Sequence, residues 1–175
     1  MEETLSRKLN ITDIKRIASR ASESVRNKDT LWEYVCSDSR RIGVNALWAM
    51  THLPDSENDW LLSKRDEMID MLLSETDPAK KRMLLQILRR PDYGRESVRT
   101  DFLDFCLSKI NSECEPYAVR CFSIYAAFKM CRLFPELIAE LQLHLDMMRL
   151  QSLSPGLKST LRQTEAKISK LKKTP

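Results

Sequence analysis

Few residues that could do chemistry stand at the spacings that chemistry requires. His52 and His144 are far apart in the chain, and neither belongs to a metal-ligand spacing. The five cysteines include no C-x-x-C pair, which favours small core side chains over metal ligands. No G-x-S-x-G nucleophile motif occurs, and three isolated glycines make no phosphate-binding loop. The sequence therefore predicts no catalytic residue, no metal ligand and no cofactor.

Four polar residues instead recur at a nearly constant interval, and they must mark the elements of the fold. Asp38, Asp77, Glu115 and Ser154 are spaced 39, 38 and 39 residues apart, and proline follows each of the last three. A polar side chain at this position can bond the free N–H groups of a helix, and proline fits the first helical position. Helix starts repeated at this interval indicate a stacked helical-repeat protein.

Apolar residues between these starts recur every three or four positions, which predicts two helices per unit. Residues 154–173 carry a single apolar stripe and predict a terminal capping helix; their two heptads are too few to favour the alternative, a two-chain coiled coil. We expect one domain over residues 1–175. Its units are a degenerate N-terminal repeat at 10–36, full repeats at 38–75, 77–113 and 115–152, and a C-terminal capping helix at 154–173.

The repeat units resemble the HEAT or armadillo-type families, and HEAT fits better. In residues 115–127, Pro116 is followed by Val119-Arg120 and then the small Cys121, a pattern similar to the first helix of a HEAT unit. Arg82 likewise stands four residues after Pro78. The resemblance spans about residues 10–173, although Gly43 and Ser159 replace the arginine in the other units. It implies an all-α fold, a right-handed α–α superhelix of about 7–9 antiparallel helices, but by itself it gives no function. The function that we favour from the sequence is a non-enzymatic protein-interaction or scaffold module.

The two helix sets carry opposite charge. Lys, Arg, Asp and Glu give the first helices (38–51, 77–90, 115–132 and 154–173) a net charge of +12, and the second helices (55–75, 96–113 and 134–150) one of −9. In solenoids that resemble this one, second helices line the concave surface, so we expect that surface to be acidic. A basic peptide or protein partner would suit it, although such charges can also serve only to solvate a surface. The candidate residues of this acidic interaction face are Asp66, Asp70, Asp101, Asp104, Glu136, Glu140 and His144.

Nucleic-acid binding is the main alternative, because certain DNA glycosylases that excise alkylated purines are HEAT-like proteins. Asp59 and Trp60, with Trp32 and Trp48, could supply the carboxylate and the aromatic cradle of such an enzyme. The expected cationic groove is missing, since Lys and Arg cluster on the opposite helices, and a net charge of +4 does not demand a nucleic acid. Residues of that basic side are Arg40, Arg41, Lys80, Lys81, Arg89, Arg90, Lys158, Arg162 and Lys167.

The N-terminal residues lack the apolar core of a signal peptide, and the longest uncharged run near the centre, 121–128, is too short to span a membrane. An odd number of cysteines suits a reducing compartment. We therefore expect a cytoplasmic protein, a monomer or a weak dimer.

Overall fold

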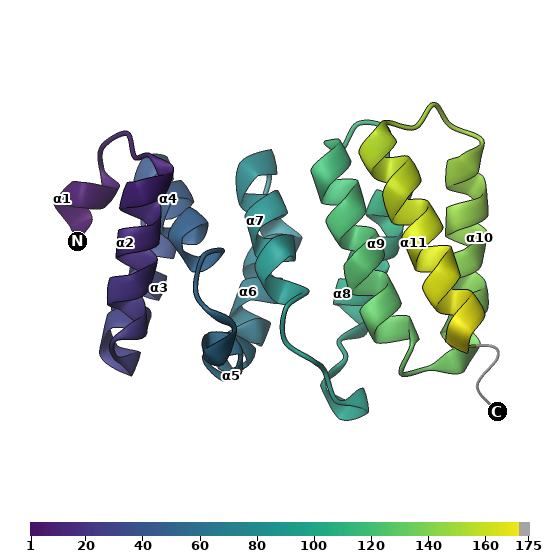
Figure 1. Ribbon diagram of the computed structural model, residues 1–175, viewed down its shortest axis with the longest axis horizontal. Helices are drawn as coiled ribbons and strands as arrows, with labels where there is room; N and C mark the ends of the chain where they lie inside the picture. The colour runs from purple at the N-terminus through teal and green to yellow at the C-terminus, as the bar shows by residue number, and fades with distance from the viewer. Residues whose placement is uncertain (172–175) are drawn as a thin grey trace. The chain divides into compact units, whose positions relative to one another are not determined.

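The computed structural model describes residues 1–171, and all regular structure in that range is helical (Figure 1). The expected all-α class is confirmed. The helices form two compact units, which are described separately: unit 1 spans Met1–Pro91 and unit 2 begins at Asp92. This boundary falls inside the expected repeat 77–113.

Unit 1 consists of two helical layers. Helices α2, α4 and α7 pack against one another in sequence order, and α3 and α6 pack against α4 and α7. The apolar side of α2 shows how the pattern forms this core: Ile14, Ile17, Ala18 and Ala21 are buried. The elements are α1 (Glu2–Leu5), α2 (Ile11–Ser22), α3 (Val25–Val35), α4 (Arg40–Met50), η1 (Asp55–Glu57), α5 (Asn58–Ser63), α6 (Arg65–Ser74) and α7 (Pro78–Leu88).

Unit 2 repeats the two-layer arrangement. Helix α9 packs against α8 and α11, and α10 packs against α8 and α9. The elements described are η2 (Arg95–Ser97), α8 (Thr100–Ile110), α9 (Tyr117–Cys131), η3 (Pro135–Leu137), α10 (Ile138–Arg149) and α11 (Pro155–Leu171). The expected capping helix, 154–173, ends outside the described residues.

Residues 1–171 contain eleven α-helices, against the 7–9 expected. Two local features account for the difference. A short helix, α1, precedes the first repeat, and the long helix expected after Asp55 is divided at Lys64 into α5 and α6. Lys64 has φ −97° and ψ 4°, which turns the chain between the two pieces.

Two of the four repeated polar residues cap helices as expected. Asp77 accepts a hydrogen bond from the Ala79 N–H at 2.8 Å, and Ser154 accepts one from the Leu157 N–H at 3.3 Å. The other two expectations were wrong by one position. Ser39 occupies the N-cap of α4 in place of Asp38, and Pro116 occupies that of α9 in place of Glu115. Pro116 keeps an extended ψ of 144°, so its helix starts one residue later than those after Asp77 and Ser154.

A buried arginine ties together three segments of unit 2. Arg120 on α9 is 2% exposed. Its Nε donates a hydrogen bond to the Ile110 carbonyl at 2.9 Å, and its guanidinium also donates to Gln151 Oε1. Gln151 in turn donates to the Asn111 carbonyl at 3.0 Å. The end of α8 and the chain after α10 are thus both bonded to α9 through one side chain, which satisfies carbonyls at a helix end.

Candidate functional site

The seven residues of the predicted acidic face belong to different units. Asp66 and Asp70 lie on α6 of unit 1 and are exposed. The other five lie in unit 2, on elements that are close together because α8 packs against α10. These five are Asp101 and Asp104 on α8, Glu136 on η3, and Glu140 and His144 on α10.

Two of these carboxylates already have cationic partners. Arg65 pairs with Asp66 at 2.9 Å, and Arg99 pairs with Asp101 at 2.6 Å. The hydrogen bond from Arg99 holds the pKa of Asp101 below its usual value. In residues 1–171, Asp104, Glu136 and Glu140 are exposed and make no ion pair. Asp70 is also engaged in an interaction within the chain, so the carboxylates still available to a partner are those of unit 2.

His144 acts as a structural link between α8 and α10. It is half-buried, and the Asn111 side-chain amide lies 3.3 Å from its Nδ1 and donates to its carbonyl oxygen at 3.1 Å. The His144 ring is therefore engaged in a contact inside the unit. Glu136 and Glu140, in contrast, are exposed to solvent on neighbouring turns.

An exposed apolar stripe on α10 was missed by the sequence reasoning. Leu143, Met147 and Leu150 are 61%, 51% and 89% exposed. They are spaced four and three residues apart, so they share one side of the helix. The buried residues of α10, among them Leu141 and Leu145, occupy the opposite side. The sequence does contain a sign of this stripe, because the helix has a second set of apolar residues at three- and four-residue spacing.

Acidic side chains border this stripe. Glu140 and Asp146 are exposed on either side of it, and Gln142 donates a hydrogen bond to Asp146 at 3.0 Å. The one basic residue of α10, Arg149, is bound instead to Glu165 on α11. The combination is a solvent-exposed apolar stripe in an acidic surround, which we call the α10 face. Its residues are Glu136, Glu140, Leu143, Asp146, Met147 and Leu150.

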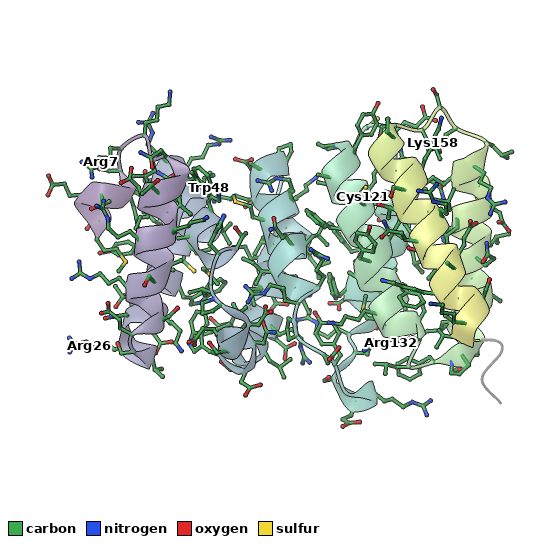
Figure 2. The ribbon with its side chains drawn as sticks, viewed as in Figure 1. Arg7, Arg26, Trp48, Cys121, Arg132 and Lys158 are labelled. Carbon is green, nitrogen blue, oxygen red and sulfur yellow. The ribbon has the colours of Figure 1, made fainter. Side chains whose placement is uncertain are left out.

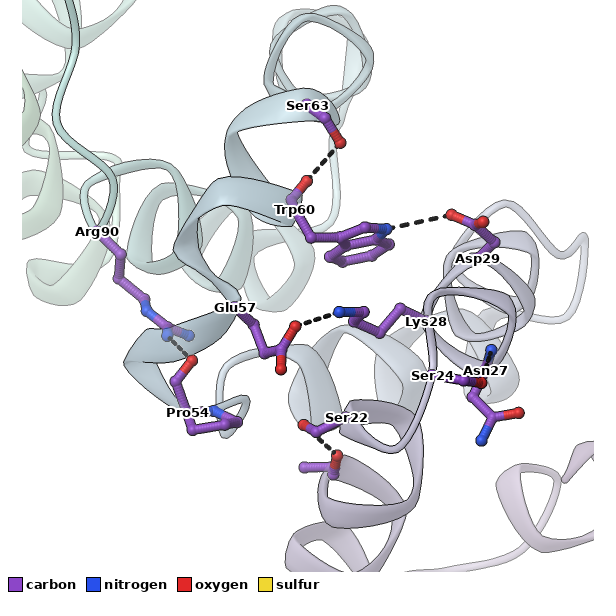
Figure 3. Close-up of polar contacts among 11 residues, drawn as sticks. Ser22, Ser24, Asn27, Lys28, Asp29, Pro54, Glu57, Trp60, Ser63 and Arg90 are labelled. Carbon is purple, nitrogen blue, oxygen red and sulfur yellow. Dashed lines mark hydrogen bonds and ion pairs between the residues drawn. The ribbon is translucent and has the colours of Figure 1, made fainter.

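Two tryptophans that could have formed a base-binding site are used to connect helices of unit 1, and Figure 3 shows one of them, Trp60. Trp60 Nε1 donates to Asp29 at 3.1 Å, and the Lys28 ammonium lies 5.9 Å from the Trp60 ring centroid. Trp32 Nε1 donates to the Glu67 carboxylate at 2.9 Å. Both indoles thus donate their N–H groups to carboxylates of the same unit.

Ion pairs also occupy much of the predicted basic side. Arg40 pairs with Asp77 at 2.6 Å, and Arg90 with Asp55 at 3.3 Å. The Lys167 ammonium lies 5.7 Å from the Tyr125 ring centroid. In the described part of the chain, only Arg41, Lys158 and Arg162 of the nine predicted basic residues have no polar or ring partner. These nine residues therefore do not form a continuous basic surface with unpaired charges.

Residues 1–171 hold no group of three or more side chains that could bind a metal ion. His52 Nδ1 lies 2.9 Å from the Trp48 carbonyl and 3.0 Å from the Thr51 hydroxyl, so its ring is held by its own turn.

The cysteines divide into exposed and buried thiols, and we expect their reactivity to follow. Cys36 and Cys114 are exposed, whereas Cys106 and Cys131 are buried. Burial raises the pKa of Cys131 to about 12 and that of Cys106 well above its usual value. A raised pKa lowers the thiolate fraction, so with an aromatic disulfide reagent near pH 8 both buried thiols should react only after unfolding. Mass-spectrometric mapping of the labelled cysteines checks this, and fast labelling of Cys106 in the native protein would contradict it.

The sequence profile of the HEAT repeat domain matches residues 1–168. No curated protein and no solved structure matches the chain significantly. Within the described residues, no helix has the length and apolar character needed to cross a bilayer.

Proposed function

Because this chain belongs to the HEAT repeat domain family, we propose that it is a protein-interaction module that binds its partner through the α10 face. The exposed stripe of Leu143, Met147 and Leu150 carries the proposal. Burying each of these side chains against a partner would contribute about 1.5–3 kcal/mol before the costs of association. Three such anchors in a row are what a helix-in-groove or helix-on-helix contact uses.

The chemistry of the α10 face points to a basic amphipathic helix as the partner. Its apolar side would cover the stripe, and its Lys or Arg residues would meet Glu136, Glu140 and Asp146. The carboxylates would add to the rate of encounter and to selectivity, while the apolar anchors supply most of the affinity.

A synthetic peptide tests this proposal. The probe is a fluorescein-labelled peptide of about 18 residues with Leu at positions i, i+3, i+4 and i+7 of each repeat and Lys elsewhere. Fluorescence anisotropy should show saturable binding, and the double variant Leu143→Ser/Leu150→Ser should weaken it about 100-fold, because two anchors are lost. Both residues face solvent, so circular dichroism should show an unchanged fold.

Two controls separate this site from general stickiness. Val25 is also an exposed aliphatic residue, at 60%, and Val25→Ser should leave binding unchanged. A peptide with Glu in place of Lys should bind at least about tenfold more weakly, because it meets like charges. Equal binding of both peptides, or an equal effect of Val25→Ser, would refute the proposal.

We further propose that the protein acts in the cytoplasm as a monomer or weak dimer. The free, exposed thiols of Cys36 and Cys114 suit a reducing compartment. Sedimentation of the native chain tests the oligomeric state. A stable dimer abolished by Leu143→Ser/Leu150→Ser would mean that a second copy, not a different protein, covers the α10 face.

A further inference from the structure

A cleft of about 440 Å³ opens in unit 1 beside the segment that joins α1 to α2. Its size falls within the range of small-molecule binding sites. The side chains around it are the cations Arg7, Lys8 and Arg41, the apolar or aromatic groups Leu9, Val44 and Trp48, and the amide of Asn45. The cleft lies outside unit 2, and the proposed protein contact makes no use of it.

Helix α4 supplies one wall of the cleft with a regular stripe. Arg41, Val44 and Trp48 follow one another at three- and four-residue intervals, so they share one side of the helix. Arg41 and Trp48 are two turns apart, roughly 10 Å along the helix axis. This wall of the cleft therefore has a charged group at one end, an apolar group in the middle and an aromatic group at the other end.

A buried amide fixes the opposite wall. Asn45 is 8% exposed, and its side-chain amide donates to the Leu5 carbonyl at 2.8 Å and to the Arg7 carbonyl at 3.0 Å. These bonds attach the segment with Arg7 and Lys8 to the helix that carries Arg41. The fold therefore holds the backbone that carries the three positive side chains beside the cleft.

No carboxylate of the described residues is paired with these charges. Within residues 1–171, Arg7, Lys8 and Arg41 are exposed and have no ion pair, whereas Arg40, the neighbour of Arg41, is paired with Asp77. Three unpaired cations around one cleft favour an anion with more than one negative charge. A phosphate group is an anion of this kind, and a guanidinium can bind it through two hydrogen bonds.

Trp48 differs from the other two tryptophans. Trp32 and Trp60 both donate their indole N–H to carboxylates, but in the described residues the Trp48 N–H has no hydrogen-bond partner. Trp48 is half-buried, and the His52 ring lies edge-on to it at a centroid distance of 6.4 Å. An indole with a solvent-accessible surface in a cationic cleft is a stacking surface for a flat aromatic group.

We propose that this cleft binds a nucleotide, with the phosphate at Arg7, Lys8 and Arg41 and the base against Trp48. A phosphate and an aromatic ring joined by a short spacer match the order of groups along the cleft. The nucleotide can be free, or it can be the 5′-terminal unit of a single strand, since both present the same two groups. Figure 2 shows Arg7 and Trp48 toward one end of the helices of this unit, and Arg26, at the start of α3, toward the other end.

Isothermal titration of the whole chain tests the proposal, with ADP and a 5′-phosphorylated oligothymidylate of about eight nucleotides as probes, in about 50 mM salt. At least one probe should bind. Arg41→Gln should weaken binding about tenfold through loss of a bidentate contact, and Trp48→Leu should do so by a similar factor through loss of stacking. Arg7→Gln, at an exposed residue, repeats the test without altering the helix packing.

Arg26→Gln is the matched control, because Arg26 is an exposed arginine on α3 outside the cleft. It should leave affinity unchanged. Preferred binding of ADP would identify a free nucleotide, and preferred binding of the oligonucleotide would identify a strand end. The proposal is overturned if neither probe binds, if Arg26→Gln weakens binding as much as Arg41→Gln does, or if tripolyphosphate binds as tightly as ADP and Trp48→Leu has no effect.

Discussion

Replacing Arg120 with alanine should lower the free energy of unfolding of unit 2 by about 4 kcal/mol. The guanidinium is almost fully buried and donates to the Ile110 carbonyl and to Gln151 Oε1. Hydrogen bonds from a charged donor contribute about 1.5–3 kcal/mol each, and the acceptors left behind would remain buried. Gln151 would lose the partner that orients it toward the Asn111 carbonyl. The loss should therefore exceed that of an ordinary polar substitution.

Urea unfolding followed by circular dichroism measures this effect. Arg82→Ala is the matched control: Arg82 stands at the equivalent place after Pro78, but it is only half-buried and has a weak bond to Gln86 at 3.4 Å. It should cost less than about 1 kcal/mol. Arg120→Lys should fall between the two, because a lysine keeps the charge but not the forked geometry. Equal losses for Arg120→Ala and Arg82→Ala would contradict the structural role assigned to Arg120.

The features of the fold that could be predicted are those determined by local chemistry. Asp77 and Ser154 each lie before a proline and cap a helix, since the capping bond needs only neighbouring residues. Glu115 has the same sequence context, yet it pairs with Lys109 at 3.1 Å and its helix starts later. This ion pair joins the last turn of α8 to the segment before α9, so it depends on the path of the connecting turn, which helical periodicity does not encode.

The candidate site was predicted in part, for a similar reason. The acidic character of Glu136 and Glu140 follows from their types and helical spacing, and both are exposed. The spacing of Leu141, Leu145 and Met148 predicts the core side of α10, and all three are buried against α8 and α9. The second apolar register of the same helix, Leu143, Met147 and Leu150, was missed because the helical pattern alone does not show whether another element covers it. Tertiary packing, not helix propensity, leaves the other stripe in solvent.

The contacts of Lys28 could not be predicted from the sequence, because a lysine on a helix is ordinarily solvated. Here its side chain is 9% exposed and is paired with Glu57, which is 13% exposed (Figure 3). Its ammonium also lies beside the Trp60 ring, and Trp60 is bonded to Asp29. One buried cation thus connects α3 with η1 and α5.

Lys28→Met should consequently destabilise unit 1 by about 3 kcal/mol, because it leaves the Glu57 carboxylate buried without its partner. Replacing both residues, in Lys28→Met/Glu57→Met, should recover most of that loss, since two apolar side chains can pack where the ion pair stood. Tryptophan fluorescence during urea unfolding reports on this unit, because Trp32, Trp48 and Trp60 all lie in it.

The exposed pair of Lys64 and Glu67 provides the comparison for this cycle. Its side chains are 25% and 54% exposed, so Lys64→Met should cost less than about 1 kcal/mol. A double variant no more stable than Lys28→Met alone would show that Lys28 stabilises the unit through its aliphatic packing or its contact with Trp60. The carboxylate of Glu57 would then be an incidental neighbour, and the free energy would have to be assigned to the indole contact instead.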